Sequence, residues 1–250
     1  MLESRYDTAS RKALERTGLG PGWRCLEIGG GGGSLGDWLG ERVGPQGEVT
    51  VTDIEPARAE SRPRAANVRV LRHDITRDPL PGAGYDLVHA RLVLLHLPER
   101  LRVLERLAGV LRPGGWLVLE EFDCGWTPVL AAPDDSAALL FERVHTALLR
   151  LLEKAGAEPL WGRHVVRAML RAGLAEVTAT TYAEAWPGGG AGIGLHRANT
   201  EQVADQVGEL GITAAELDAF LALLDDPRFV VNSYPLLSAS GRRPGAETAR

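Results

Sequence analysis

The chain has 250 residues, of which 44% are hydrophobic, and its formal net charge is −5. This length and apolar content suffice for one buried core, with or without an appended lid, and no separate second domain is required. The acidic balance, together with the lack of a compact lysine and arginine run in the sequence, argues against nucleic acid or anionic lipid as a partner and favours a small molecule.

Targeting and redox signals are sparse. The first 16 residues are charged and lack the apolar core of a signal peptide, and no later stretch has the apolar length of a membrane span. We therefore expect a cytoplasmic protein. Cys25 lies in a predicted strand and Cys124 follows another, which indicates buried, reduced thiols and neither a disulfide framework nor a metal cluster.

The first half of the chain alternates strand and helix. After an N-terminal helical segment, strands are predicted at 24–28, 48–52, 68–72, 85–90 and 115–121. This alternation predicts an α/β fold with a doubly wound, mostly parallel sheet. Before the fifth strand, an apolar helical stripe stops at a glycine-rich turn, Arg112-Pro-Gly-Gly115. The stripe consists of Leu101, Leu104, Leu107, Ala108 and Leu111.

Beyond residue 122 the pattern becomes mainly helical. Helices are predicted near 134–154 and 162–172, a strand near 175–182, and a break in the glycine-rich stretch 187–194. Two more helices are predicted near 200–210 and 213–224, before an extended segment around 229–240 that contains Pro235. The surplus of helix predicts a cover over the carboxyl edge of the sheet, where open α/β sheets bind ligands. Such a cover would determine substrate choice.

The most specific motif is the run Cys25-Leu-Glu-Ile-Gly-Gly-Gly-Gly-Gly-Ser34, in which an apolar strand ends in five glycines. Glycine allows a ligand to approach the backbone closely, and the N–H groups of the loop and of a helix that begins at Ser34 can face an anionic group. The run predicts a nucleotide-like cofactor without naming it.

One register of this loop is that of a dinucleotide site. Gly31-x-Gly33-x-x-Gly36 matches the fingerprint of nicotinamide enzymes, and Asp53 ends the second strand 20 residues after Gly33. An NAD-dependent oxidoreductase is therefore one interpretation. It does not predict an acidic residue after the third strand, where the chain has Asp74.

The other register is Glu27-x-Gly29-x-Gly31-x-Gly33, and in this register the chain resembles the class I S-adenosylmethionine-dependent methyltransferases of bacterial small-molecule type. In that family the acidic residue two positions before the first glycine belongs to the motif. His73-Asp-Ile75 and the segments 85–98 and 111–121 also resemble family motifs, as does the final strand, which resembles the antiparallel closing strand. The resemblance covers roughly residues 20–122 at motif level. We interpret the Gly36 match as incidental.

The resemblance implies a seven-stranded Rossmann-like sheet and an enzyme that uses S-adenosylmethionine and releases S-adenosylhomocysteine. The glycines would approach the methionine portion of the cofactor, Asp53 would accept bonds from both ribose hydroxyls, and Asp74 would accept one from the adenine amino group. The predicted cofactor-binding residues are Glu27, Gly29, Gly31, Gly33, Ser34, Asp53, Ile54, Asp74, Ile75, Ala90 and, closing over the cofactor from the N-terminal helix, Tyr6.

The same resemblance implies one methyltransferase domain over residues 1–250. Within it we expect an N-terminal helical segment at about 1–20 and a cofactor-binding core at about 21–122. Cover segments are expected at about 123–160 and 186–228, and a closing strand at about 229–244. The residues leave the oligomeric state open, including a homo-oligomer.

His89, Arg91 and His96 surround the carboxyl end of the fourth strand, which in this family faces the transferable methyl group, and they are the candidate catalytic residues. A hydrogen-bonded structural role is the alternative for the histidines. Because the sulfonium already activates the methyl group, the protein mainly has to align the acceptor and exclude water.

A hydroxyl acceptor would also need a base, for which His89 is the first candidate. We therefore expect O-methylation of a small molecule, favoured over C- or N-methylation and consistent with natural-product biosynthesis. A cofactor-dependent cyclisation or rearrangement, a protein that only binds the cofactor, and the NAD-dependent oxidoreductase are the alternatives.

Overall fold

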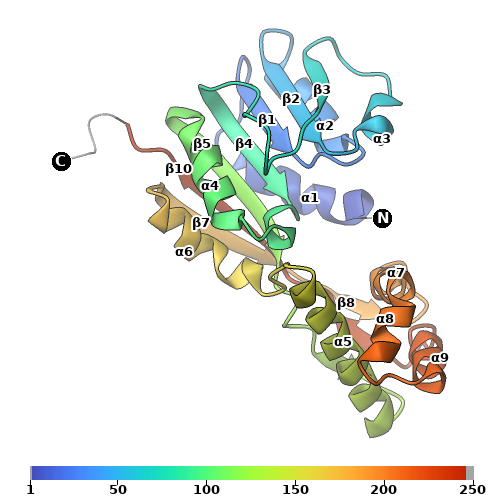
Figure 1. Cartoon of the computed structure of the whole chain (residues 1–250). Helices are drawn as coiled ribbons and strands as arrows, with labels where there is room; N and C mark the ends of the chain where they lie inside the picture. The colour runs from blue at the N-terminus through green and yellow to red at the C-terminus, as the bar shows by residue number, and fades with distance from the viewer. Residues whose placement is uncertain (1, 246–250) are drawn as a thin grey trace.

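The computed structural model describes residues 2–245. Its main sheet has seven strands in the order β3-β2-β1-β4-β5-β10-β7, and β10 runs in the opposite direction to the other six (Figure 1). The predicted doubly wound, mostly parallel sheet is confirmed. Its strands are β1 (Arg24–Ile28), β2 (Glu48–Asp53), β3 (Val68–Arg72), β4 (Tyr85–Arg91), β5 (Leu111–Phe122), β7 (Ala175–Tyr182) and β10 (Leu236–Arg242).

Helices cover both faces of this sheet. Because successive strand residues point to opposite faces, Cys25 and Leu87 pack with α1 (Leu2–Glu15) and α2 (Ser34–Val43), whereas Leu26 and Val88 pack with α4 (Arg100–Gly109) and α6 (Val165–Arg171). A short helix, α3 (Ala57–Glu60), lies in the connection between β2 and β3. In Figure 1, α4 and α6 lie on the near face of the sheet.

Two segments of the chain after β5, one before α6 and one between β7 and β10, form a second lobe at the carboxyl end of the parallel strands, as the predicted cover requires (Figure 1). It contains a small antiparallel sheet in the order β6-β9-β8, which the sequence patterns did not indicate. The elements of this lobe are β6 (Val129–Ala131), α5 (Asp135–Lys154), β8 (Ala185–Pro187), α7 (Gly194–Gln202), α8 (Ala204–Glu209), α9 (Ala214–Leu223) and β9 (Val230–Asn232).

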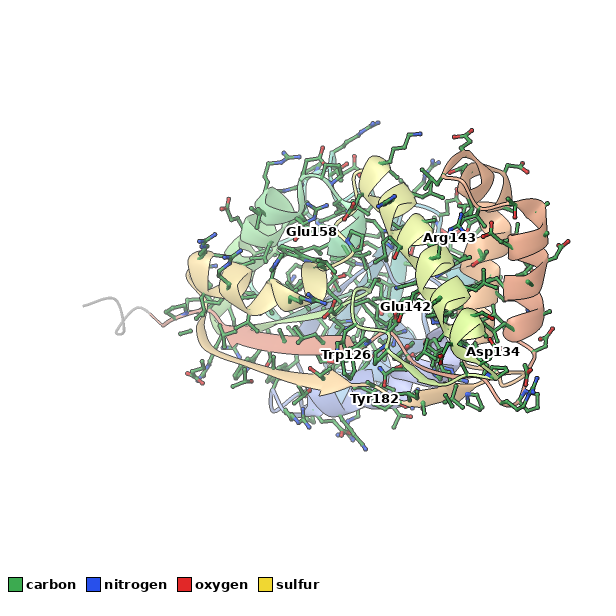
Figure 2. All side chains as sticks on the ribbon, turned by 90° about the horizontal axis from the view of Figure 1, so that it is seen from below. Trp126, Asp134, Glu142, Arg143, Glu158 and Tyr182 are labelled. Carbon is green, nitrogen blue, oxygen red and sulfur yellow. The ribbon has the colours of Figure 1, made fainter. Side chains whose placement is uncertain are left out.

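An aromatic cluster holds the second lobe together and joins it to the sheet. Phe141, Trp186 and Phe220 are buried in one apolar cluster with Tyr6 of α1 and Phe122 at the end of β5. At the surface of the lobe, Arg143 of α5, labelled in Figure 2, pairs with Glu216 of α9. The two lobes therefore share a core. Among the helices of residues 2–245, none combines the length and the apolar content that a membrane-spanning segment requires.

Two predicted boundaries and one residue assigned to an apolar helix face were wrong. The helix predicted at 200–210 is two helices, because α7 begins inside the glycine-rich stretch and ends before Val203, after which α8 begins. The fifth strand begins at Leu111 and not at Gly115, because Leu111 pairs with Tyr85 of β4. Leu101, assigned to the apolar stripe of the preceding helix, is 56% exposed.

The extended segment predicted at 229–240 is also divided. β9 pairs with β6 and β8 in the small sheet, whereas β10 pairs with β5 and β7 in the main sheet. Between them the chain crosses from one lobe to the other at Ser233, which donates its N–H to the Glu184 carbonyl at 2.8 Å, and Pro235, which has no N–H to continue a strand ladder. Only β10 is the antiparallel closing strand.

Candidate functional site

The predicted cofactor residues meet at the carboxyl edge of β1, β2 and β3, which are neighbours in the sheet. Glu27 lies one residue before the end of β1, Asp53 is the last residue of β2, and Asp74 follows β3 by two residues. Because parallel strands end at the same edge, three carboxylates far apart in sequence share one border of the sheet.

The backbone conformation of the glycine loop separates the three glycines of the Glu27-x-Gly29-x-Gly31-x-Gly33 motif from the two glycines between them. Gly29, Gly31 and Gly33 have positive φ values of 66°, 54° and 79°, whereas the intervening Gly30 and Gly32 do not have positive φ. Residues with side chains rarely adopt this left-handed conformation. Gly33 is the N-cap of α2, and Ser34 is its first residue, so the helix N-terminus opens at the loop.

Gly36 has a packing role that the interpretation of an incidental match missed. A Cβ at Gly36 would lie 2.3 Å from Val51 Cγ2 and 2.9 Å from Glu27 Oε2. Glycine at this position therefore lets α2 approach β1 and β2 closely, which places the glycine loop over the end of β1.

Asp53 ties the end of β2 to the glycine loop. Its Oδ2 accepts the Gly31 N–H at 2.8 Å, and its Oδ1 accepts the Glu55 N–H at 2.9 Å. Each carboxylate oxygen has a further lone pair, so the group can still accept two bonds from a diol. The neighbouring Ile54 side chain is 58% exposed and offers apolar surface beside it.

Asp74 is held by its own turn. Its Oδ1 accepts from the Thr76 N–H at 2.9 Å and from the Thr76 hydroxyl at 2.6 Å, and these bonds lower the pKa of the carboxyl group. Asp74 is therefore a charged acceptor at neutral pH. Ile75 is only 7% exposed and belongs to the apolar cluster beneath the sheet edge.

Glu27 is a buried carboxyl group without a complete set of partners. It is 3% exposed, and burial raises its pKa to about 7, although His89 and Arg91 act in the opposite direction. Its Oε2 has no hydrogen-bond partner in the described part of the chain. Because burying an unpaired carboxylate is costly, this group fits a ligand that brings a positive charge to the loop.

His89 and Arg91 lie beneath α1. His89 is fully buried, and its Nε2 lies 3.1 Å from Glu120 Oε2. Arg91 Nη1 donates to Asp7 Oδ1 at 3.0 Å and to Ser10 Oγ at 2.9 Å, both on α1. The two side chains thus join the sheet to the N-terminal helix, and their predicted catalytic roles stay predictions.

His96 and the loop before it follow β4. His96 is exposed at the end of a 3₁₀ turn, Leu94–His96. The Leu94 and Leu95 N–H groups donate to the buried Glu121 carboxyl group at 2.9 and 3.3 Å, which anchors this turn. Val93 covers the glycine loop, because a Cβ at Gly29 would lie 2.4 Å from Val93 Cγ2.

Tyr6 and Ala90 lie in less accessible positions than the other predicted cofactor residues. Tyr6 is fully buried, with ring centroids 5.3 Å from Phe122 and 5.9 Å from Tyr182, and its hydroxyl has no hydrogen-bond partner among residues 2–245. Ala90 is fully buried, and its side chain joins the cluster under α4 and α6. Their predicted cofactor contacts stay predictions.

The sequence predictions missed Glu120 and Glu121 as site residues. Both are fully buried, and they point to opposite faces of β5, Glu120 toward α1 and Glu121 toward the turn after β4. Two adjacent acidic residues at the end of an apolar strand were a usable signal, since a buried charge requires partners.

The pKa values of the buried carboxyl groups indicate how the free energy of unfolding depends on pH. Burial raises the pKa of Glu27 to about 7 and that of Glu121 to about 8, so the folded chain retains protons that the unfolded chain has lost. His145 and His196, whose pKa burial lowers, act in the opposite direction, but only below their unfolded value of about 6.5. We expect the unfolding free energy to fall, on the order of 2 kcal/mol, as pH rises from about 6.5 to 8.

Urea denaturation at a series of pH values checks this expectation. Glu121→Gln, which cannot ionise, should reduce the slope between pH 6.5 and 8, and adding Glu27→Gln should reduce it further. An unfolding free energy that rises across this window would contradict the assignment of these two groups.

Comparison with known proteins gives an independent result. A family model described as a methyltransferase domain matches residues 26–117. Methyltransferase str2 of Strobilurus tenacellus is 33% identical over 148 residues, 58% of this chain and 50% of str2. The ubiquinone/menaquinone biosynthesis C-methyltransferase UbiE of Nitrosospira multiformis is 31% identical over 176 residues, 59% of this chain and 72% of that protein. The chain spans only about half the length of str2.

Solved structures share the fold at low sequence identity. A Bacillus halodurans C-125 protein aligns with a TM-score of 0.59 at 15% identity, covering 94% of this chain and 98% of that one. Haemonchus contortus phosphoethanolamine N-methyltransferase 2, in complex with phosphomonomethylethanolamine and S-adenosylhomocysteine, aligns with a TM-score of 0.56 at 13% identity, covering 95% and 52% of the two chains. These likenesses support the overall architecture.

Proposed function

Because the chain belongs to the class I S-adenosylmethionine-dependent methyltransferases, we propose that it transfers a methyl group from this cofactor to a hydroxyl oxygen of a small-molecule acceptor. The observation that carries the proposal is the placement of Glu27, Asp53 and Asp74 around a glycine loop at one edge of the sheet, below an aromatic second lobe. The family assignment removes the nicotinamide interpretation.

The residues at this edge fit the cofactor. Asp53 retains lone pairs for a ribose diol, Asp74 is a charged acceptor for an amino group, and the exposed Ile54 can pack on a base. The unpartnered Glu27 oxygen suits a cationic group at the loop, where the left-handed Gly29 allows close approach. When bound, S-adenosylmethionine supplies a methyl group that its sulfonium has already activated.

The second lobe supports a role in holding the acceptor and excluding water. Burial lowers the pKa of His145, and it lowers that of His196 to about 3, so both imidazoles are neutral at neutral pH. Within the described residues, His145 Nδ1 and His196 Nε2 have no hydrogen-bond partner. Neutral imidazoles among aromatic rings favour an uncharged aromatic acceptor, which an imidazole could orient by a hydrogen bond.

We also propose that the chain forms a single domain. Residues 21–122 would form the cofactor-binding core, and 123–160 and 186–228 the cover over it. The aromatic cluster supports this division into one domain, because Tyr6 of α1 and Phe122 of β5 pack with Phe141 of the second lobe.

Carbon methylation is a second candidate, because UbiE of Nitrosospira multiformis is named a C-methyltransferase and is 31% identical to this chain. A carbon acceptor would be an electron-rich aromatic ring, which would also suit the aromatic side chains of the second lobe. Its methylation would require removal of a proton from a ring carbon and not from a hydroxyl oxygen. A rearrangement catalyst or a binding protein on the same fold is the remaining alternative.

Incubation with methyl-labelled S-adenosylmethionine and a panel of phenols, quinols and amines tests the proposal. We expect label on oxygen and an equal yield of S-adenosylhomocysteine, measured by mass spectrometry. Label on a ring carbon would replace the O-methylation proposal with C-methylation. Rearrangement without a mass gain, or cofactor binding without any product from the panel, would count against methyl transfer to these acceptors.

A further inference from the structure

A row of buried polar side chains crosses the middle of the main sheet on the face that α1 covers. Glu27 of β1 is paired in register with His89 of β4, and Glu120 of β5 is paired with Ser238 of β10. All four are at most 6% exposed. Because ionisable groups in the centre of a sheet are costly to bury, their alignment across adjacent strands requires an explanation.

At the β5–β10 end of this row, the polar groups around Glu120 are joined by hydrogen bonds. Glu120 accepts from His89 Nε2 at 3.1 Å and also bonds to Ser238 and to Ser10 of α1. Burial alone would raise the pKa of Glu120, but these bonds outweigh it and lower that pKa. Glu120 is therefore a carboxylate, and the Nε2 of His89 carries the proton that it donates.

The other end of the row is open and lies under the glycine loop. His89 Nδ1 is 3.9 Å from Glu27 Oε1, which is within ion-pair range but too long for a hydrogen bond. Neither Nδ1 nor Glu27 Oε2 has a hydrogen-bond partner in the part of the chain that the structure describes. A Cβ at Gly30 would lie 3.4 Å from Glu27 Oε2, so this open oxygen is directly beneath the loop.

The open end allows one proton to occupy either of two positions. It can lie on the Glu27 carboxyl group, with His89 neutral, or on His89 Nδ1, with Glu27 a carboxylate. Because 3.9 Å is too long for a direct hydrogen bond, transfer requires the two side chains to move closer or a water molecule to bridge them. The transfer breaks the O–H bond of Glu27 and forms an N–H bond on His89, and the total charge of the pair is unchanged. Only the second arrangement presents a negative charge to the loop.

We propose that His89 and Glu120 are positioning residues for the cofactor: His89 takes the proton of Glu27, and Glu120 stabilises the resulting imidazolium. Glu27 then faces the cationic group of the cofactor as a carboxylate, without releasing a proton to solvent. This inference rests on the proposed place of Glu27 in the cofactor site. His89 acts through Glu27 and does not touch the acceptor.

The other charged groups around Glu27 have partners of their own. Arg91, which follows His89 on β4, pairs with Asp7 of α1 at 3.0 Å. Arg64, in the segment before β3, pairs with Asp37 of α2 at 2.6 Å. Each pair is neutral as a whole, which leaves His89 as the neighbour that gains or loses charge beside Glu27. Burial raises the pKa of Glu27 to about 7, so this carboxyl group holds a proton near neutral pH more readily than an exposed one does.

His89→Gln tests the proposal, because glutamine can still donate to Glu120 but cannot accept the proton. Binding of S-adenosylmethionine, without acceptor, is measured by calorimetry from pH 6 to 8 in two buffers of different ionisation heat. For the unmodified chain we expect a nearly constant Kd and no net proton release. For His89→Gln we expect binding roughly tenfold weaker at pH 6 than at pH 8, with release of about one proton at pH 6, because Glu27 must then ionise to solvent.

His164→Gln is the matched control, because His164 also pairs with a glutamate, Glu158, but lies outside the row. It should reproduce the unmodified profile. A flat profile without proton release in His89→Gln would overturn the proposal. If Glu27→Gln binds S-adenosylmethionine as tightly as the unmodified chain, the assignment of Glu27 to the cofactor site fails instead.

If His89→Gln does not fold, a second measurement that does not use this variant tests the same proposal. Nitrogen-15 NMR of histidine-labelled, unmodified protein reports the protonation of each imidazole, and Glu27→Gln identifies the signal that depends on Glu27. We expect one buried imidazole to become doubly protonated when S-adenosylmethionine binds, and this change to disappear in Glu27→Gln. The absence of such a change in the unmodified protein would also overturn the proposal.

Discussion

Asp53→Ala is expected to weaken S-adenosylmethionine binding by at least about 100-fold, because two hydrogen bonds to a charged acceptor, each contributing about 1.5–3 kcal/mol, would be lost. The same substitution frees the Gly31 N–H that Asp53 Oδ2 now accepts at 2.8 Å, so the loop that approaches the cofactor also loses its tie to β2. Calorimetric titration with S-adenosylmethionine measures the change in Kd.

Asp86→Ala is the matched control for this experiment. Asp86 also accepts a backbone N–H from a neighbouring strand, that of Arg24 at 2.7 Å, but it lies at the opposite, amino-terminal edge of the sheet. We expect it to lower stability and leave the Kd unchanged. Asp53→Asn, which keeps one acceptor oxygen, should fall between the alanine variant and the unmodified chain. An Asp53→Ala protein that is folded and binds with unchanged Kd would exclude the ribose-binding role.

Gly29→Ala is expected to have the second large effect, on both folding and cofactor binding. The φ of Gly29 is +66°, and an added Cβ would lie 2.4 Å from Val93 Cγ2. The left-handed conformation costs about 1–2 kcal/mol in alanine, and overpacking costs about 1–3 kcal/mol more. We expect urea denaturation to show a loss of about 2–5 kcal/mol and calorimetry to show no measurable cofactor binding.

Two further variants separate the causes of this effect. Gly22 has a φ of +81° with no atom within 4 Å of an added Cβ, so Gly22→Ala reports the backbone cost alone. Val93→Ala combined with Gly29→Ala removes the clashing methyl group and should restore stability to the level of Gly22→Ala. Binding should remain impaired in the double variant if the cofactor approaches the Gly29 backbone. Full recovery of binding would show that only the contact with Val93 matters.

The sequence predicted the main sheet well, because its strands are short apolar runs separated by helical patterns and turns. The bounds of β1, β3 and β7 were predicted as the structure has them. The small sheet was missed because its strands have only three residues each, too few to show a period of two, and because β9 pairs with segments far away in the chain.

The site was predicted less completely than the fold. Local motifs sufficed to place the glycine loop, Asp53 and Asp74 at one edge of the sheet, because glycine content and a carboxylate after a strand are visible in a few adjacent residues. Their contacts with the cofactor stay predictions. The environment of His89 was not visible in this way. Its Nε2 partner, Glu120, is 31 residues away in the chain, and the helix that covers both begins near the N-terminus.

The alternation of elements and the cofactor class could therefore be inferred from the chain before folding, since both depend on residue types at short, regular spacings. The buried row of Glu27, His89 and Glu120 under α1, by contrast, became visible in the folded chain. The reason is physical: the charge and hydrogen bonding of a buried group depend on neighbours that strand pairing brings together, and the pairing order β1-β4-β5 is not the order of the chain.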